Sequence, residues 1–178
     1  MQEEHVVVVD EQGVVLGTEE KMAAHRLGLL HRAFSVFIFN DQHQLMLQQR
    51  ALHKYHSGGL WTNTCCSHPR LHESYADGAQ RRLFEEMGFH SEMKPVFEFI
   101  YRAELDKGMI EHELDHVFFG YSNTTPQLNP EEAAAYRYVS LDVLDDEMKN
   151  QPEQYTEWFK IAYAQVRTLW LERIRQAA

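Results

Sequence analysis

Short apolar runs separated by short polar segments recur along the chain, and most of these runs occur in pairs. Each segment between the two runs of a pair contains turn-forming residues such as Gly, Asn or Asp, which is typical of antiparallel strands joined by a tight connection. Three pairs predict β-hairpins: 6–9 with 13–17, 33–39 with 44–50, and 95–105 with 109–122.

Two further segments predict strands without an obvious hairpin partner. LWTNTCCS (60–67) follows the polar loop ALHKYHSGG (51–59), and YRYVSL (136–141) lies in the last third of the chain. Both are rich in the aromatic and β-branched residues that strands prefer.

Helical spacing of apolar residues occurs in two longer segments. Over residues 73–88, Ala76, Leu83 and Met87 fall on one side, and Gly88 predicts the C-terminal end of the helix. Residues 154–176 repeat the same spacing. Because strands and helices mix without a regular βαβ order, we expect an α/β (α+β) sandwich with a mixed sheet flanked by helices.

Composition is typical of a soluble globular protein, and a length of 178 residues fits a single domain spanning 1–178. The chain has no apolar run near the roughly 18 residues that span a bilayer, and its acidic start does not resemble a signal peptide. We therefore expect a cytoplasmic protein, not bound to membranes, whose thiols stay reduced. A net charge of −10 argues against a nucleic-acid partner.

The two cysteines of the chain are adjacent, in TNTCCSHPRLHE (62–73). Neighbouring side chains on a strand point to opposite faces, so Cys65 and Cys66 form a poor disulfide, whereas Cys66 and His68 share a face. A metal site, a redox site, a catalytic thiol and plain packing all remain open for this stretch. By the same alternation, Glu111 and Glu113 share a face and could act as paired oxygen ligands or as a solvated edge.

Other candidate residues are less specific when taken alone. His25 and His31 are six residues apart, so the two side chains could bind the same metal ion only with a turn between them. Lys21, Arg50, Lys54 and Arg82 are spaced as ordinary solvated cations would be. Eleven histidines in the chain nonetheless favour metal chemistry.

The most specific pattern spans residues 67–89 and resembles the Nudix box, a loop–helix–loop whose glutamates collect divalent metal beside a diphosphate. Two positions depart from that box. Ser67 stands in place of its Gly, and Arg82 stands in place of a metal-binding Glu, which adds a bidentate phosphate donor. The matching residues are Glu73, Arg81, Leu83, Glu85, Glu86, Gly88 and Phe89.

Over most of its length the sequence resembles the type 1 isopentenyl-diphosphate Δ-isomerases, a family with the Nudix fold. The resemblance is carried by EEKMAAHRLGLLHRAFSVFIFN (19–40), by residues 48–73, by the altered box, and by EHELDHVF (111–118). It implies a small-molecule substrate, an allylic or homoallylic diphosphate, and a monomer or weak homodimer.

The resemblance also implies metal and substrate ligands. Two metal ions are implied. One of them is Mg²⁺, bound by Glu86 and bridging to the substrate diphosphate. Lys21, Arg50, Lys54 and Arg82 match the family's diphosphate contacts. Mn²⁺ or Mg²⁺, with Zn²⁺ as a competitor, is implied at a five-ligand site made of His25, His31, His68, Glu111 and Glu113.

The implied reaction is isomerisation of isopentenyl diphosphate to dimethylallyl diphosphate, for isoprenoid biosynthesis. Cys66 and Glu113 match the catalytic pair, with Tyr101 beside Glu113 as a further proton donor and Cys66 acting as a thiolate. Trp158 matches the aromatic residue that faces the carbocation, and Trp61 is a second candidate.

Two other functions remain as alternatives. One is a Nudix hydrolase of a diphosphate-containing substrate, which the loss of a glutamate at Arg82 disfavours. The other is a metal- or redox-sensing module that uses the paired cysteines and His68 and performs no turnover.

Overall fold

The centre of the fold is one fully paired strand, β3 (His31–Phe39), in a computed structural model that describes residues 4–177. It pairs in parallel with β8 (Ile110–Tyr121) along its whole length and antiparallel with the short β6 (Cys65–Ser67). β1 (His5–Val9) joins at its start, and β4 (Leu45–Arg50) joins at its end.

The remaining strands extend this sheet on both sides. β2 (Val15–Glu20) pairs with β1, and β7 (Met93–Glu104) pairs with β8. β5 (Trp61–Thr62) and β9 (Ala133–Val139) pair with β4. Only the β3–β8 pair is parallel among the pairs between these strands, so the sheet is mixed.

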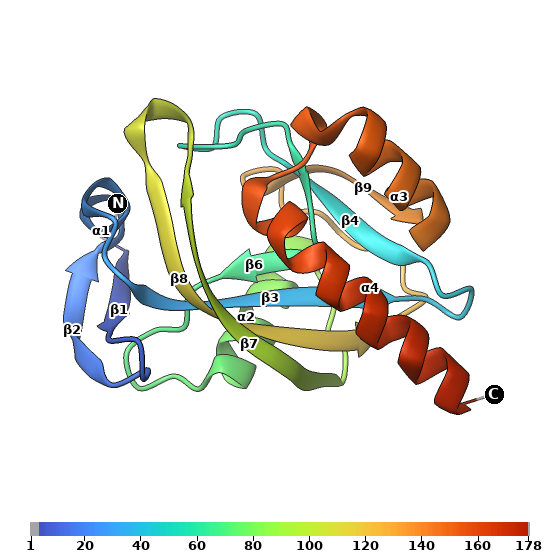
Figure 1. The fold of residues 1–178 in the computed structure, drawn as a ribbon, viewed down its shortest axis with the longest axis horizontal. Helices are drawn as coiled ribbons and strands as arrows, with labels where there is room; N and C mark the ends of the chain where they lie inside the picture. The colour runs from blue at the N-terminus through green and yellow to red at the C-terminus, as the bar shows by residue number, and fades with distance from the viewer. Residues whose placement is uncertain (1–3, 178) are drawn as a thin grey trace.

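Within residues 4–177, four α-helices accompany the sheet: α1 (Lys21–Leu27), α2 (Tyr75–Met87), α3 (Leu141–Asn150) and α4 (Glu157–Ala177). Two short 3₁₀ helices lie at Asp106–Gly108 and Pro152–Gln154. In Figure 1, α4 crosses the sheet on the face toward the viewer and α2 lies behind it. This arrangement confirms the expected mixed sheet flanked by helices.

The alternation of side chains along β3 places one large apolar cluster on each of its faces. Phe37 and Phe39 pack with α4 residues such as Phe159 in one core. Phe34 and Val36 pack on the other face with the apolar side of α2. Because β3 is buried on both faces, its sequence is almost continuously apolar.

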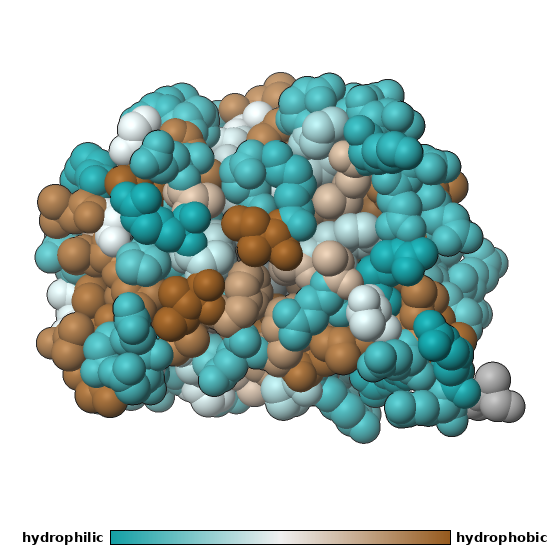
Figure 2. Space-filling view, in the orientation of Figure 1, coloured by the Kyte–Doolittle hydropathy of each residue, from teal (hydrophilic) through white to brown (hydrophobic). Residues whose placement is uncertain are grey.

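The surface in Figure 2 intersperses hydrophilic and hydrophobic residues, with apolar ones gathering at the end formed by β1 and β2. Val14, Val15 and Leu16 are exposed in that region. In the described part of the chain, the helices are all too short or too polar to cross a membrane.

Two of the three predicted hairpins are confirmed, as β1–β2 and β7–β8. The third, 33–39 with 44–50, is wrong as a two-stranded unit, because β3 and β4 pair only at Phe39 and Leu45 next to the turn. Beyond the turn they diverge to other partners. A strand that is apolar on both faces is satisfied better inside a sheet than in an isolated hairpin.

The prediction of one strand over 60–67 is also wrong, because residues 63 and 64 interrupt it between β5 and β6. The Asn63 amide donates to the carbonyls of Val36 (3.3 Å) and Cys65 (2.7 Å). The Thr64 hydroxyl donates to the Met46 carbonyl (2.6 Å). These side-chain hydrogen bonds replace the ladder and connect residues 63 and 64 to β3, β4 and β6.

The predicted helix over 73–88 is α2, which begins after the N-cap Ser74 and ends before Gly88. Ala76 is exposed, and Ala79 packs in the core in its place. Gly78 has a structural reason within this helix, since a Cβ there would lie 3.0 Å from the ring of Phe34.

The sequence does not predict α1 and α3, and the strand predicted over 136–141 is β9, which begins three residues earlier and ends two residues earlier. α1 has only seven residues, too few to show a repeating apolar stripe. Ser140 lies inside the strand predicted over 136–141, but in the structure it is the N-cap of α3. Its hydroxyl accepts a hydrogen bond from the Val143 amide (3.4 Å).

We expect Gly88→Ala to destabilise the protein more than Gly108→Ala does. Both glycines have a left-handed backbone conformation, with φ of +74° at Gly88 and +72° at Gly108. A Cβ at Gly88 would lie 2.6 Å from the Gln127 carbonyl oxygen, whereas a Cβ at Gly108 would face open space. We predict a loss of about 1 kcal/mol for Gly108→Ala and roughly 2–4 kcal/mol for Gly88→Ala in urea unfolding. Equal losses would show that the Gln127 contact does not constrain the end of α2.

Candidate active site

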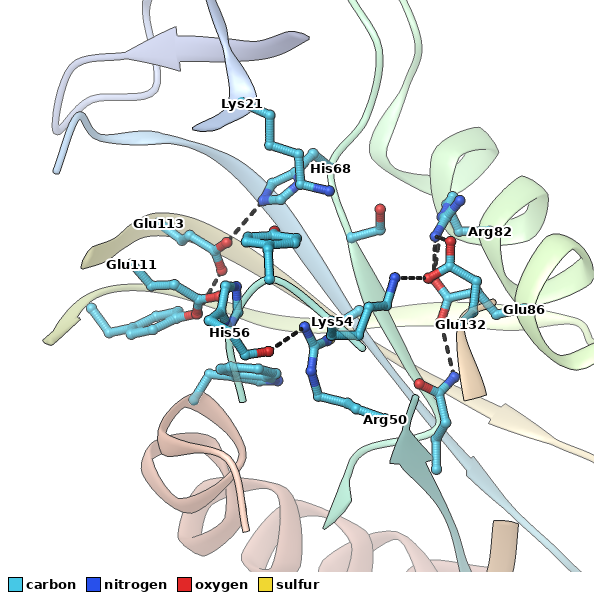
Figure 3. Close-up of a pocket in the computed structure, with 16 residues that line it drawn as sticks. Lys21, Arg50, Lys54, His56, His68, Arg82, Glu86, Glu111, Glu113 and Glu132 are labelled. Atoms are coloured by element: carbon cyan, nitrogen blue, oxygen red, sulfur yellow. Dashed lines mark hydrogen bonds and ion pairs between the residues drawn. The ribbon is translucent and has the colours of Figure 1, made fainter. Parts of the chain in front are cut away.

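A narrow pocket at the junction of α1, α2, β6 and β8 collects most of the chain's candidate residues (Figure 3). In the figure, His68, Glu111 and Glu113 gather on one side, while Arg82, Glu86 and Glu132 lie on the other. The lining residues include Lys21, Arg50, Lys54, Tyr55, His56, Cys66, His68, Arg82, Glu86, Tyr101, Glu111, Glu113, Glu132 and Trp158.

One side of the pocket is a cluster of imidazoles around a carboxylate. His25, His31, His68 and Glu113 each place one ligand atom within 4.8 Å of the others. The Nε2 atoms of His31 and His68 are 3.2 Å apart, and they lie 3.5 Å and 3.0 Å from Glu113 Oε1. The turn needed between His25 and His31 is present, because α1 ends before a left-handed Gly28 and β3 starts at His31.

Backbone carbonyls fix the orientation of two of these rings. His25 Nδ1 lies 2.7 Å from the Lys21 carbonyl oxygen, and His31 Nδ1 lies 2.7 Å from that of Leu29. A carbonyl can only accept, so each Nδ1 carries the proton and each Nε2 presents a lone pair. This is the outer-shell arrangement that metal-binding histidines commonly have.

Glu111 and Glu113 share a face of β8 and contact the same phenol. Tyr101 Oη lies 2.5 Å from Glu111 Oε2 and 2.6 Å from Glu113 Oε2. Burial and the neighbouring Glu113 charge raise the pKa of Glu111. Burial alone would raise the pKa of Glu113 too, but its contacts with the His31 and His68 rings hold it well below its usual range. Two buried carboxyl groups this close therefore need a proton or a cation between them.

The cluster fits a divalent metal ion on its own geometry. His25 Nε2 is buried without a hydrogen-bond partner, which is uncommon for a nitrogen atom in a protein interior. Burial lowers the pKa of His68 to about 3, so its ring is neutral, the form that binds metals.

The opposite side of the pocket is rich in cations, each held by a carboxylate or a carbonyl. Arg82 is 2.8 Å from Glu86 and 3.0 Å from Glu132, and Lys54 also pairs with Glu132. Lys21 pairs with Glu4 at 2.9 Å and reaches the pocket from α1.

Arg50 is held differently from the other cations. It donates to the carbonyl of His56 (3.3 Å), and its guanidinium carbon lies 5.2 Å from the ring centroid of Trp158. The guanidinium therefore contributes positive charge to the middle of the pocket.

The paired cysteines face opposite sides of the sheet. Cys65 is fully buried in the core beneath α2, whereas Cys66 lines the pocket and packs with the α4 core. Burial raises the pKa of Cys66, and nearby carboxylates add to this, so the group is a neutral thiol here. A buried anion beside carboxylates is disfavoured, so a thiolate at Cys66 would need positive charge such as that of Arg50 close by.

Of the two tryptophan candidates, Trp158 lines the pocket and is 2% exposed. Trp61 is not among the lining residues, and its ring instead stacks with the Arg137 guanidinium at 4.7 Å. The suggestion of Trp61 as a second aromatic partner in the pocket is therefore wrong.

Known proteins with similar sequences agree on one family. A model of the NUDIX domain family matches residues 29–159. The isopentenyl-diphosphate Delta-isomerase of Pectobacterium atrosepticum is 51% identical over 165 residues, which are 93% of this chain and 92% of that protein. The chain belongs to the isopentenyl-diphosphate Delta-isomerase family.

A second relative supports this assignment, and two solved structures share the fold. Isopentenyl-diphosphate Delta-isomerase 2 of Aromatoleum aromaticum is 53% identical over 156 residues, covering 88% of this chain and 82% of that protein. Among solved structures, DR0079 from Deinococcus radiodurans superimposes with a TM-score of 0.70 at 18% identity, over 83% of this chain and 90% of that one. The MutT protein of Methanosarcina mazei gives 0.60 at 21% identity, over 83% and 94%. These two structures support the Nudix fold.

Within this isomerase-family chain, several pocket residues had no signal in the sequence. Glu132 follows an asparagine-proline turn and reads as a solvated acid, yet it joins Lys54 and Arg82 across the pocket. Gln48 lies on β4, and its amide donates to Glu86 (2.9 Å). His56 sits in a polar loop, and only its closeness to Lys54 in the sequence could have suggested a role.

We expect Mn²⁺ to stabilise metal-free protein, because the ion would neutralise the buried carboxylates and engage the unpartnered Nε2 atom of His25. At a hundredfold excess over its Kd, a ligand adds about 2.7 kcal/mol, or roughly 5–10 °C in Tm for a chain of this size. His25→Ala should remove most of this shift.

The matched control is His116→Ala, on the opposite face of β8 against Tyr75. This variant should keep the full shift in a thermal melt. An equal shift in both variants would contradict a metal site at His25.

Proposed function

We propose that this chain interconverts isopentenyl diphosphate and dimethylallyl diphosphate by protonating and deprotonating carbon, as a step of isoprenoid biosynthesis. The observation that carries the proposal is that one pocket holds both a cationic side and the side chains of Cys66, Tyr101 and Glu113. The names of relatives at about 50% identity support the same reaction.

The cationic side would bind the diphosphate. Lys21, Arg50, Lys54 and Arg82 all line this pocket, which concentrates positive charge inside a protein of net charge −10. Guanidinium groups match phosphate oxygens in bidentate fashion, so Arg50 and Arg82 would set the orientation. A substrate diphosphate would share or replace their present carboxylate and carbonyl partners.

Glu86 is placed to hold a Mg²⁺ ion beside the diphosphate. It is 3% exposed and accepts from Arg82 at Oε1 and from Gln48 at Oε2. Each carboxylate oxygen has a second lone pair that remains available to a cation. When bound, Mg²⁺ would supply charge neutralisation for the phosphate oxygens.

Cys66 and Glu113 would move the protons. Protonation of an unactivated alkene gives a tertiary carbocation, so one group must deliver a proton and another must remove a different one. Cys66 lies on β6 and Glu113 on β8, and both side chains are on the face of the sheet that α4 covers. The Tyr101 hydroxyl donates a hydrogen bond to Glu113. The forward and reverse reactions exchange the acid and base roles of this pair.

Two features of the pocket would protect the carbocation. Trp158 offers an indole face that is 2% exposed, and cation–π attraction in such a dry site reaches about 2 kcal/mol or more. The side chains that line the pocket are all buried or half-buried, which would limit the access of water that could capture the cation.

The imidazole–carboxylate cluster would anchor one member of the catalytic pair. A divalent ion bound by His25, His31, His68, Glu111 and Glu113 would supply positive charge that keeps the Glu113 carboxylate ionised and fixed in place. Mn²⁺ or Mg²⁺ suits a donor set that mixes imidazole with carboxylate, and Zn²⁺ competes for it.

A Nudix hydrolase of a diphosphate-containing substrate is the second candidate. Against it stands Arg82, which occupies the position of a metal-binding glutamate and pairs with Glu85, Glu86 and Glu132. A guanidinium at this position neutralises the carboxylates that would otherwise collect several metal ions for hydrolysis.

The proposal is tested by incubating the protein and two cysteine variants with isopentenyl diphosphate and separating the products. We expect dimethylallyl diphosphate from the native protein and at least a 100-fold lower rate from Cys66→Ala, since a positioned proton-transfer group contributes this much or more. Release of phosphate or pyrophosphate without dimethylallyl diphosphate would support the hydrolase instead.

Cys65→Ala is the matched control, because Cys65 is the neighbouring residue on the opposite face of the sheet. We expect it to keep its turnover and to lose about 1 kcal/mol of stability from the small cavity beneath α2. A comparable loss of activity at both positions would contradict the separate roles of the two thiols.

A further inference from the structure

His56 is a buried histidine in the loop between β4 and β5, and none of the roles proposed above uses its imidazole. The residue is 1% exposed, and its Nε2 atom has no hydrogen-bond partner. Its Nδ1 atom lies 3.2 Å from the Ser57 hydroxyl oxygen. If Nδ1 donates to that hydroxyl, as the rings of His25 and His31 donate to carbonyls, the Nε2 lone pair faces the pocket.

The loop that carries His56 is held firmly. The Ser57 amide donates to Asp106 (2.8 Å), and the His56 carbonyl accepts from Arg50. A Cβ at Gly58 would lie 2.5 Å from the Leu52 carbonyl oxygen, so the backbone is closely packed there. The ring is therefore positioned by its surroundings and does not hang free at the pocket edge.

The free Nε2 atom is directed at a carboxylate of the metal cluster. It lies 3.5 Å from Glu111 Oε1, the same separation as that between His31 Nε2 and Glu113 Oε1. Figure 3 shows His56 beside Glu111. The separation is long for a hydrogen bond, whereas an octahedral site with bonds of about 2.1 Å places neighbouring ligand atoms about 3 Å apart.

A second group of potential ligands links His56 to the first. His25, His56 and Glu111 also place ligand atoms within 4.8 Å of one another, and His25 belongs to both groups. An imidazole nitrogen has one lone pair and binds one ion, so His25 cannot serve two separate metals. If both groups bind metal, they therefore bind one and the same ion through His25.

We infer that His56 is a fourth imidazole ligand of this ion, which would then be held by His25, His31, His56, His68, Glu111 and Glu113. The inference rests on the metal site of the proposed function and adds a ligand to it. With one oxygen from each carboxylate, the set gives six donors and leaves no position for water. Four imidazoles also favour Mn²⁺ and later transition metals over Mg²⁺, which prefers oxygen.

A competing role for His56 is purely structural. Its ring meets Trp158 edge-to-face at 5.7 Å and could orient that indole or Glu111 without touching a metal. The two roles differ in the number of imidazoles that coordinate the ion and in the presence of a metal-bound water.

The test counts coordinated imidazoles in native protein labelled with ¹⁵N-histidine and loaded with Mn²⁺, using pulsed EPR. Four coupled ring nitrogens are expected. Three would overturn the role of His56 while leaving the metal site intact. Failure to bind Mn²⁺ at all would overturn the metal site together with this inference. Because the count uses native protein, it does not depend on a variant that folds.

A pair of substitutions gives a second readout. His56→Phe keeps a ring in the buried site but removes the nitrogen, so we expect three imidazoles, a water on Mn²⁺ that raises water-proton relaxivity, and at least a tenfold weaker Kd. The matched control is His53→Phe in the same loop, where the side chain is 59% exposed. It should leave all three measurements unchanged. Native relaxivity and four imidazoles in His56→Phe would overturn the inference.

Discussion

The parallel pairing of β3 with β8 is the constraint on which the pocket depends. It places His31 opposite Glu113 in the sheet, and the same strand pairs Ser35 with Cys66 on its other side. A shift of one residue in this register would turn Glu111 and Glu113 toward the face of Leu114 and separate them from the imidazoles. The apolar cores on both faces of β3 oppose such a shift, so packing energy positions the polar groups.

Charge compensation is the second constraint. The pocket buries carboxylates, cations and imidazoles together, and each group is tolerable only because an opposite charge or a proton is close. Lys54 and Arg82 converge on Glu132, while Tyr101 contacts both Glu111 and Glu113. A diphosphate at one side and a divalent ion at the other would complete these charges, and the two sites are connected through Arg50 and His56.

The sequence predicted the parts of the molecule that depend on local pattern. The helix ending at Gly88, the strand carrying Glu111 and Glu113, and the opposite faces of Cys65 and Cys66 all follow from helical or strand periodicity. The divergence of β3 from β4 did not follow, because the choice among several apolar partners is made by tertiary packing. α1 is too short to show a period.

The candidate site residues also separate into those that a local sequence pattern predicts and those that only the fold brings to the pocket. Most of the pocket's residues belong to motifs with characteristic spacing, and these could be named before the structure was known. Glu132, Gln48 and His56 could not be, since each looks like an ordinary polar residue until the fold brings it to the pocket. The neutral state of Cys66 was likewise invisible in sequence, because it depends on burial and on carboxylates that are distant along the chain.

The central claim is that the pocket moves protons to and from carbon and does not cleave phosphate. It is tested most directly by supplying isopentenyl diphosphate to the protein in D₂O and examining the product by mass spectrometry and NMR. We expect dimethylallyl diphosphate with deuterium in a methyl group, because the added proton comes from an exchangeable group of the enzyme. Product without deuterium, or phosphate release without rearrangement, would contradict it.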